Sequence, residues 1–362
     1  MAEASLFIHR SKIVSLSAEP QAPQPGNNKL RLEFAKFPVF RALFSDDSTD
    51  TYTLTMPSTL RAFILAARPK TLPAAVCPVV AGSALAWLLE EQFSWLLMWA
   101  TLLSTIAIQV ATNYFNDAVD ADKGADTSAR IGPVRATASG LVSRNSMMLA
   151  GAAAALAAAA FSVPLVQERG WPIIVIGVVS LFFSYGYTGG PMPLAYVGLG
   201  EVFVMLFFGF IAVMGTVFVQ TGQWITESPL LGLQIGSLST ALIAINNLRD
   251  IEEDTRSQKR TLAVRCGKTA ARWMITVWCL LPHVAGFCWL GVANILSEMP
   301  PRDMLVTSIW LPLVTLPLAL FIVMKIWRTQ PSPAYNKYLA LSGLHLLLWT
   351  ALFTAACLRA QP

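Results

Sequence analysis

Long apolar stretches without charge dominate the chain and predict membrane-spanning helices, since a helix needs roughly 20 apolar residues to cross a bilayer. The run 170–200 is too long for one span, and the residues Gly189-Gly190-Pro191-Met192-Pro193 divide it into two. The pattern predicts nine helices, near residues 71–89, 92–116, 145–167, 171–188, 194–220, 228–248, 273–297, 304–324 and 338–358. Because a backbone in lipid must satisfy its own hydrogen bonds, we expect an all-α bundle of membrane helices.

The composition excludes other classes of protein. Of the 362 residues, 55% are apolar and only 13% are charged, and the mean hydropathy is +0.55. Soluble domains carry about 25% charged residues, so a cytosolic globule, a disordered chain and a fibrous protein are all excluded. The five cysteines show no CxxC spacing and the three histidines lie far apart, so we expect neither a disulfide framework nor a zinc site.

Lysine and arginine are concentrated in loops on one side of the predicted bundle. These loops precede the first predicted helix and follow the second, sixth and eighth. The other side holds only Arg169, Arg302 and Arg359. Cytoplasmic loops are the ones enriched in cations, so we expect the N-terminus in the cytoplasm and the C-terminus outside. The net charge of +5 is explained by these loops, and no nucleic acid partner is expected.

The segment 1–55 differs from the rest, because it has no long apolar run and no signal-peptide core. It is open to three interpretations: a disordered extension, a cleaved targeting segment, or a gene start assigned too early, with translation beginning at Met56. Transit peptides are poor in acidic residues and this segment has six, which favours the first or the third interpretation. We expect residues 56–362 to form the nine-helix domain.

Two clusters of carboxylates stand where predicted helices end. Asn113, Asp117 and Asp120 follow the second helix at i, i+4 and i+7, so they share one helical face. A turn at Gly124 would bring Asp126 back toward that face.

The second cluster lies at the end of the sixth helix, where Asn247, Asp250 and Asp254 follow the spacing i, i+3 and i+7. Helices two and six run in the same direction, so both clusters belong on the same side of the membrane. Facing carboxylates repel one another unless cations lie between them. All-oxygen ligands of this kind suit Mg²⁺, which shares its coordination shell with phosphates.

Basic residues follow each cluster, Arg130 and Arg135 after the first and Lys259 and Arg260 after the second. Acids that hold metal and cations that hold phosphate oxygens together predict a diphosphate site. Either cluster alone would also be explained as a solvated loop that orients the protein in the membrane. Two matched clusters, each followed by cations, favour the functional interpretation.

Several ordered motifs carry a family resemblance. They are ARPKTLPA at 67–74, NDAVDADKGAD at 116–126, RIGPVR at 130–135, YTGGPMPLAYVGLGE at 187–201, NNLRD at 246–250 and KRTLAVR at 259–265. With these motifs the chain resembles the UbiA superfamily of intramembrane prenyltransferases, and within it the 1,4-dihydroxy-2-naphthoate prenyltransferases of menaquinone biosynthesis. The general superfamily pattern NDxxDxxxD ends here on Gly124, and the last acid is Asp126. The longer spacing is similar to the naphthoate branch, and it leaves Asp122 as a competitor of Asp126 for metal.

The resemblance implies nine helices around a central cavity and a transferase of the cell membrane, here a bacterial cytoplasmic membrane. The implied reaction moves a polyprenyl group from polyprenyl diphosphate to 1,4-dihydroxy-2-naphthoate with loss of CO₂, giving demethylmenaquinone and diphosphate. Mg²⁺ is the implied cofactor, with Asp117, Asp120, Asp250 and Asp254 as the catalytic acids. The implied metal ligands are Asn116, Asp117, Asp120, Asp126, Asp250 and Asp254. The implied diphosphate ligands are Arg130, Arg135, Lys259 and Arg260.

The acceptor site is less well defined by the sequence. Arg68 and Lys70 precede the first helix and are candidates for the acceptor carboxylate, for the diphosphate, or for simple orienting cations. Glu201 lies inside a predicted span, where an ionisable group is a functional candidate, although a structural hydrogen bond explains it equally well. The full set of acceptor candidates is Arg68, Lys70, Asn113, Tyr187, Glu201 and Asn247.

Two rival functions stay open at this point. A prenyl or phytyl transferase that uses another donor or another aromatic acceptor would carry the same motifs. A cation-coupled transporter would also need intramembrane acids, but transporters hold them near the bilayer midplane. The acids here lie at helix ends beside cations, which favours an enzyme.

Overall fold

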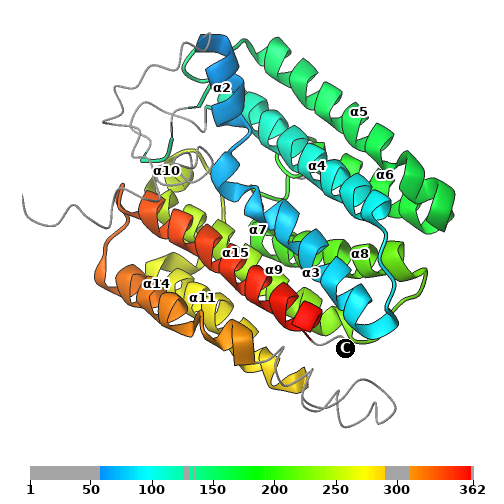
Figure 1. Ribbon diagram of the computed structural model, residues 1–362. Coiled ribbons are helices and arrows are strands. Elements are labelled where there is room, and N and C mark those ends of the chain that lie inside the picture. The colour runs from blue at the N-terminus through cyan, green and yellow to red at the C-terminus, as the bar shows by residue number, and fades with distance from the viewer. Residues whose placement is uncertain (1–57, 125–130, 134, 192, 290–309, 360–362) are drawn as a thin grey trace, which may run out of the picture. The chain divides into compact units, whose positions relative to one another are not determined.

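The computed structural model describes residues 58–124, 131–133, 135–191, 193–289 and 310–359, which belong to one compact unit, and every regular element among them is helical (Figure 1). The elements are α2 (Ser58–Ala66), η2 (Pro69–Thr71), α3 (Pro73–Glu90), α4 (Trp95–Asp122), α5 (Arg144–Arg169), α6 (Trp171–Gly186), α7 (Gly200–Val204), η3 (Met205–Ile211), α8 (Ala212–Thr221), α9 (Ser228–Arg249), α10 (Ile251–Arg256), α11 (Leu262–Gly286), α14 (Leu316–Arg328) and α15 (Tyr335–Arg359). The segment 1–55 and its boundary with the helical domain lie outside these residues.

Seven helices of the described part are long and apolar enough to cross a membrane: α3, α4, α5, the continuous stretch Gly200–Thr221, α9, the stretch Trp310–Arg328, and α15. α6 is apolar but has 16 residues, fewer than these seven. The prediction of an all-helical, multi-pass membrane protein is therefore confirmed. The count of nine spans and the cytoplasmic N-terminus remain predictions.

The seventh predicted helix is displaced from its expected position. It was placed at 273–297, whereas α11 begins at Leu262 and ends at Gly286, with non-helical backbone at Gly267. Residues 290–297 of the predicted helix lie outside the described residues. The hydroxyl of Thr261 accepts a hydrogen bond from the amide of Val264 and so caps the helix N-terminus. Its first turns are amphipathic and carry Arg265 and Lys268, so a search for uncharged stretches begins too late along the chain.

Helix α9 lies at the centre of the packing. It contacts α3, α8, α11, α15 and the π-helical segment η3. A large core cluster follows its buried face, and includes Leu231, Ile235, Leu238, Leu242 and Ile245. α4 in turn packs against α5 and α6 (Figure 1). The two helices that end in acidic clusters, α4 and α9, are thus each fixed by several neighbours.

Three glycines bring the backbones of η3 and α9 into direct contact. A Cβ atom on Gly209 would lie 2.6 Å from the carbonyl oxygen of Gly232 and 2.8 Å from the Cα of Gly236. A Cβ atom on Gly236 would lie 2.6 Å from the sulfur of Met205. Small residues allow this kind of approach in membrane helices, where packing rather than hydrophobicity drives association. The contact occurs at a π-helical turn, a conformation that is rare and often associated with functional sites.

We predict that Gly209→Ala destabilises the protein by about 1–3 kcal/mol, because the added methyl group overlaps the α9 backbone. Gly177→Ala is the matched control, since no atom lies within 4 Å of a Cβ at Gly177. Alanine in a helix interior is favoured over glycine, so the control should keep or raise stability by about 0.5–1 kcal/mol. Thermal unfolding in detergent measures both variants, and equal melting temperatures would contradict the tight contact.

Candidate functional site

A small polar cavity of about 50 Å³ brings the two acidic clusters together. Asn116 and Asp120 line it from α4, and Asn247, Asp250 and Asp254 line it from the α9–α10 region. Further lining residues among the sequence candidates are Arg68, Arg135, Tyr187, Glu201 and Lys259. Acidic and basic side chains that are far apart in sequence, such as Asp120 and Lys259 at a separation of 139 residues, therefore share one enclosed space.

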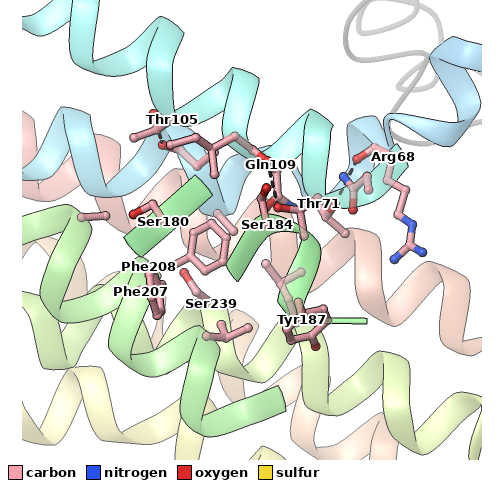
Figure 2. Close-up of a pocket in the computed structure, with 18 of the residues that line it drawn as sticks. Arg68, Thr71, Thr105, Gln109, Ser180, Ser184, Tyr187, Phe207, Phe208 and Ser239 are labelled. Carbon is pink, nitrogen blue, oxygen red and sulfur yellow. Dashed lines mark hydrogen bonds between the residues drawn. The ribbon is translucent and has the colours of Figure 1, made fainter. Parts of the chain in front are cut away.

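A second cavity of about 420 Å³ adjoins the first (Figure 2). The two share lining residues, among them Arg68, Asn116, Arg135, Tyr187 and Asn246. Beyond this polar end the cavity surface is mainly apolar, with apolar side chains from α6, α7, η3 and α8 among others. The side chains that α4 contributes are mostly polar, such as Thr105, Gln109 and Thr112. The site as a whole is a charged chamber that continues into a larger, mainly apolar one.

Asp120 is 2% exposed and is held by groups from three other segments. The hydroxyl of Tyr196 donates to its Oδ1 at 2.8 Å. The Lys259 ammonium lies 3.5 Å from Oδ2 and the Arg135 guanidinium lies 3.8 Å from it. Buried charges are tolerated only when they are paired, so these contacts explain how a carboxylate can occupy this position.

Asp117 and Asn116 have different surroundings. The Oδ1 of Asp117 accepts a hydrogen bond of 2.8 Å from the amide of Thr137, while Oδ2 is buried without a hydrogen-bond partner among the described residues. Asp117 lines the large cavity but not the small one. The hydroxyl of Thr188 donates to Oδ1 of Asn116.

Asp250 forms a two-point ion pair with its neighbour Arg249. Nε and Nη2 of Arg249 donate to the two carboxylate oxygens, each at 2.7 Å. Arg249 also donates to Asn246 at 2.8 Å and to Asn336 of α15 at 2.7 Å. The arginine is 2% exposed, so this is a buried pair whose remaining donors are largely satisfied.

The sequence predicted that the second cluster lies on one continuous helix, and this prediction was wrong. α9 ends at Arg249, Asp250 lies at the break with φ −93° and ψ 8°, and α10 begins at Ile251. Adjacent side chains on a regular helix point away from each other and do not pair. Interrupting the helix at Asp250 is what lets Arg249 and Asp250 bind each other.

Glu201 has one satisfied and one unsatisfied oxygen. Nδ2 of Asn247 donates to its Oε1 at 2.9 Å, and its Oε2 is buried without a hydrogen-bond partner among the described residues. Tyr187 lines both cavities.

Some predicted residues lie elsewhere. Arg260 is exposed and lines neither cavity, because its backbone amide is tied to the carbonyl of Tyr196 while its side chain projects outward. Lys70 and Asn113 line only the large cavity of the two, and Nδ2 of Asn113 donates to the carbonyl of Ala67 at 2.8 Å. Asp126 and Arg130 lie outside the described residues.

The donor set is suitable for a hard cation that takes few protein ligands. Within the described ranges, no three His, Cys, Asp or Glu side chains converge on one metal position. The oxygens of Asp120, Asp250 and Asp254 nevertheless line one cavity, and Asp117 presents a buried oxygen without a partner beside it. Mg²⁺ is bound in this manner, through one or two carboxylates with the rest of its shell from water and phosphate.

Sequence reasoning gave no role to three residues that organise this site. Arg249 and Tyr196 hold the two key carboxylates, and Asn336 links Arg249 to α15. Arg249 and Tyr196 both lie within the recognised motifs, so the motifs were a signal by which these two residues could have been found. Asn336 is 87 residues from its partner and no local pattern marks it.

The chain has helices long and apolar enough to cross a membrane, and buried acids and cations in a chamber joined to a mainly apolar cavity. These features define the class of intramembrane proteins with an internal charged site. Residues 75–350 match the UbiA prenyltransferase family, and the chain belongs to this family.

Relatives and a solved structure agree with this assignment. A 1,4-dihydroxy-2-naphthoate octaprenyltransferase from Haemophilus influenzae is 37% identical over 234 residues, which cover 63% of this chain and 75% of the relative. A protein of the same name from Mycobacterium leprae is 33% identical over 296 residues, covering 79% and 92%. The structure of a UbiA homolog from Archaeoglobus fulgidus bound to GPP and Mg²⁺ has a similar fold, with a TM-score of 0.54, 14% identity and coverage of 81% and 99%.

We predict that Arg249→Met costs about 3–5 kcal/mol of stability, because it leaves the Asp250 carboxylate buried and unpaired. Arg144→Met is the matched control, since Arg144 pairs with Asp122 at the surface, where an ion pair contributes at most about 1 kcal/mol. Unfolding of both variants in detergent tests this. A loss of similar size in both would show that burial of the Arg249 pair has no special importance.

Proposed function

We propose that the protein transfers a polyprenyl group from polyprenyl diphosphate to 1,4-dihydroxy-2-naphthoate with loss of CO₂. The products are diphosphate and demethylmenaquinone, formed as its quinol. The observation that carries this proposal is the single chamber in which both acidic clusters and their cations adjoin a large apolar cavity. The named activity of the bacterial relatives supports the choice of acceptor.

The polar chamber suits a diphosphate. Arg68, Arg135 and Lys259 line it and can donate charge-assisted hydrogen bonds to phosphate oxygens. Mg²⁺, held by Asp120, Asp250 and Asp254 with Asn116 and Asp117 beside them, would supply neutralisation of the charge that develops on the leaving diphosphate. The A. fulgidus homolog, solved with GPP and Mg²⁺, supports this cofactor.

The larger cavity suits the rest of the donor and the acceptor. Its apolar lining would bury the prenyl chain and keep water from the allylic carbon while the carbon–oxygen bond breaks. Arg68 and Lys70 at its polar end would receive the acceptor carboxylate. Tyr187, Glu201 and Asn247 lie next to this end and would bind acceptor hydroxyls.

The proposal includes a location and a domain boundary. The catalytic chamber would face the cytoplasm of a bacterial cell, since cation-rich loops flank it. Residues 56–362 would form the catalytic domain, and the segment 1–55 would contribute no chemistry.

We expect the detergent-solubilised protein to prenylate 1,4-dihydroxy-2-naphthoate with Mg²⁺ present and to lose the activity in EDTA. Asp117→Ala, Asp120→Asn and Asp250→Asn should each reduce turnover by on the order of 100-fold or more, since Asp120 and Asp250 line the charged chamber and Asp117 lies in the adjoining cavity with a free carboxylate oxygen for the metal. Asp122→Asn is the control, because Asp122 is exposed, pairs with Arg144 and lines neither cavity.

Three outcomes would contradict the proposal. Full activity in EDTA would exclude the metal. Turnover with a different aromatic acceptor or a phytyl donor, but not with the naphthoate and a polyprenyl donor, would assign the chain to another transferase. Ion flux in vesicles without product formation in detergent would assign it to transport.

A further inference from the structure

One wall of the large cavity is made of aromatic rings. The rings of Phe203 and Phe207 stack with centroids 4.1 Å apart and planes at 24°. Tyr187 continues the row, with its ring 5.2 Å from Phe203, and Phe183 packs behind both phenylalanines. Tyr187, Phe203 and Phe207 all line the cavity, and together they are called the aromatic wall below. Figure 2 labels Tyr187 and Phe207 of this wall. Tyr187 also lines the polar chamber, so the wall begins where the diphosphate site ends.

Ser239 presents an unpaired hydroxyl to the same cavity. Its side chain is 1% exposed, and its Oγ has no hydrogen-bond partner among the described residues. Neighbouring hydroxyls on α9 behave differently: Ser237 donates to the carbonyl of Leu233 at 2.6 Å and Thr240 to that of Gly236 at 2.7 Å. Ser239 lines the cavity and appears in Figure 2 among the residues that face it. A buried polar group without a partner costs about 1–3 kcal/mol, which a bound ligand would recover.

The glycine contact between η3 and α9 fixes the wall and this hydroxyl relative to each other. Gly209 follows Phe207 by two residues and meets Gly236, which precedes Ser239 by three. The contact is between backbones, so the helical segments that carry the wall and Ser239 are fixed relative to each other. The site is therefore preorganised.

We propose that the aromatic wall and Ser239 form the binding site for the acceptor ring, an inference that rests on the function proposed above. The flat bicyclic ring lies against Phe203 and Phe207, and one ring hydroxyl exchanges a hydrogen bond with Oγ of Ser239. Stacked aromatic faces favour a flat aromatic ligand.

The prenyl chain is the other ligand that could occupy this wall, and its chemistry fits less well. Beyond its diphosphate, a prenyl chain has no polar atom with which to satisfy Ser239. The acceptor supplies both an aromatic face and hydroxyls. Along α9, Ser239 lies seven residues, about 10 Å, before Asn246 at the polar end, which leaves the ring within reach of the reacting carbon.

The test compares Ser239→Ala with Ser237→Ala in steady-state kinetics of the purified protein. Ser239→Ala should raise the KM for the naphthoate acceptor by about tenfold, the effect expected from loss of one buried hydrogen bond. The KM for the prenyl donor should stay unchanged. Ser237→Ala should change neither constant, because the hydroxyl of Ser237 is satisfied by its own helix and does not line the cavity.

Monohydroxy analogues separate binding from packing. Inhibition constants of 1-hydroxy-2-naphthoate and 4-hydroxy-2-naphthoate are measured with both the parent protein and Ser239→Ala. The analogue that lacks the hydroxyl bound by Ser239 should have the same inhibition constant with both proteins. The inhibition constant of the other analogue should rise about tenfold with Ser239→Ala. Phe207→Leu should weaken both analogues without changing the KM for the donor, because it removes the ring face.

The outcomes distinguish this proposal from the proposed function. If the parent protein does not prenylate the naphthoate, the proposed function fails. If the parent protein is active but Ser239→Ala shifts neither the acceptor KM nor either inhibition constant, only the acceptor site is overturned. A rise in the donor KM in Ser239→Ala or Phe207→Leu would instead place the prenyl chain against the wall and would also overturn it.

Discussion

The repulsion between buried carboxylates, and its compensation by buried cations, is the constraint on which the rest of the structure depends. Asp120, Asp250 and Asp254 line one small chamber, where charges interact more strongly than in water. Asp120 is compensated by Lys259 and Arg135. Asp250 is compensated by Arg249, which also binds α15 through Asn336. Each cation comes from a different segment, so the charge balance also ties distant parts of the chain together.

Because its acids and cations are paired, the site is stable without a ligand and can still bind further charged groups. Removing one partner of a buried ion pair strongly destabilises the folded protein, because the other charge is left buried and uncompensated. The cations therefore hold the acids in place before any ligand binds. Cations and acids that face one cavity can both bind a metal–diphosphate complex, the acids through the metal and the cations through phosphate oxygens. The shape and lining of the adjoining cavity then determine which apolar groups can lie next to the charged chamber.

The sequence predicted the parts of the site that follow from local periodicity. The spacing of Asn113, Asp117 and Asp120 correctly implied one helical face, because α4 continues unbroken to Asp122. The same reasoning was wrong at Asp250, where the helix is interrupted and the adjacent residues Arg249 and Asp250 form an ion pair. It also placed Arg260 at the diphosphate, although neighbouring Lys259 lines the chamber and Arg260 points outward. Periodicity does not report side-chain contacts across the fold, which is why Asn336, Ser239, Phe203 and Phe207 were also missed, although Tyr187 of the aromatic wall was among the acceptor candidates.

The most direct test of the central claim is the affinity of a non-hydrolysable prenyl thiodiphosphate for Asp120→Asn and Asp254→Asn, measured with and without Mg²⁺. If both clusters bind one metal–diphosphate complex, each substitution should weaken binding when Mg²⁺ is present. Without metal, each should leave binding unchanged or tighten it, since a carboxylate then only repels the diphosphate. The account would be contradicted if a substitution in one cluster weakened binding in Mg²⁺ while the substitution in the other cluster had no effect.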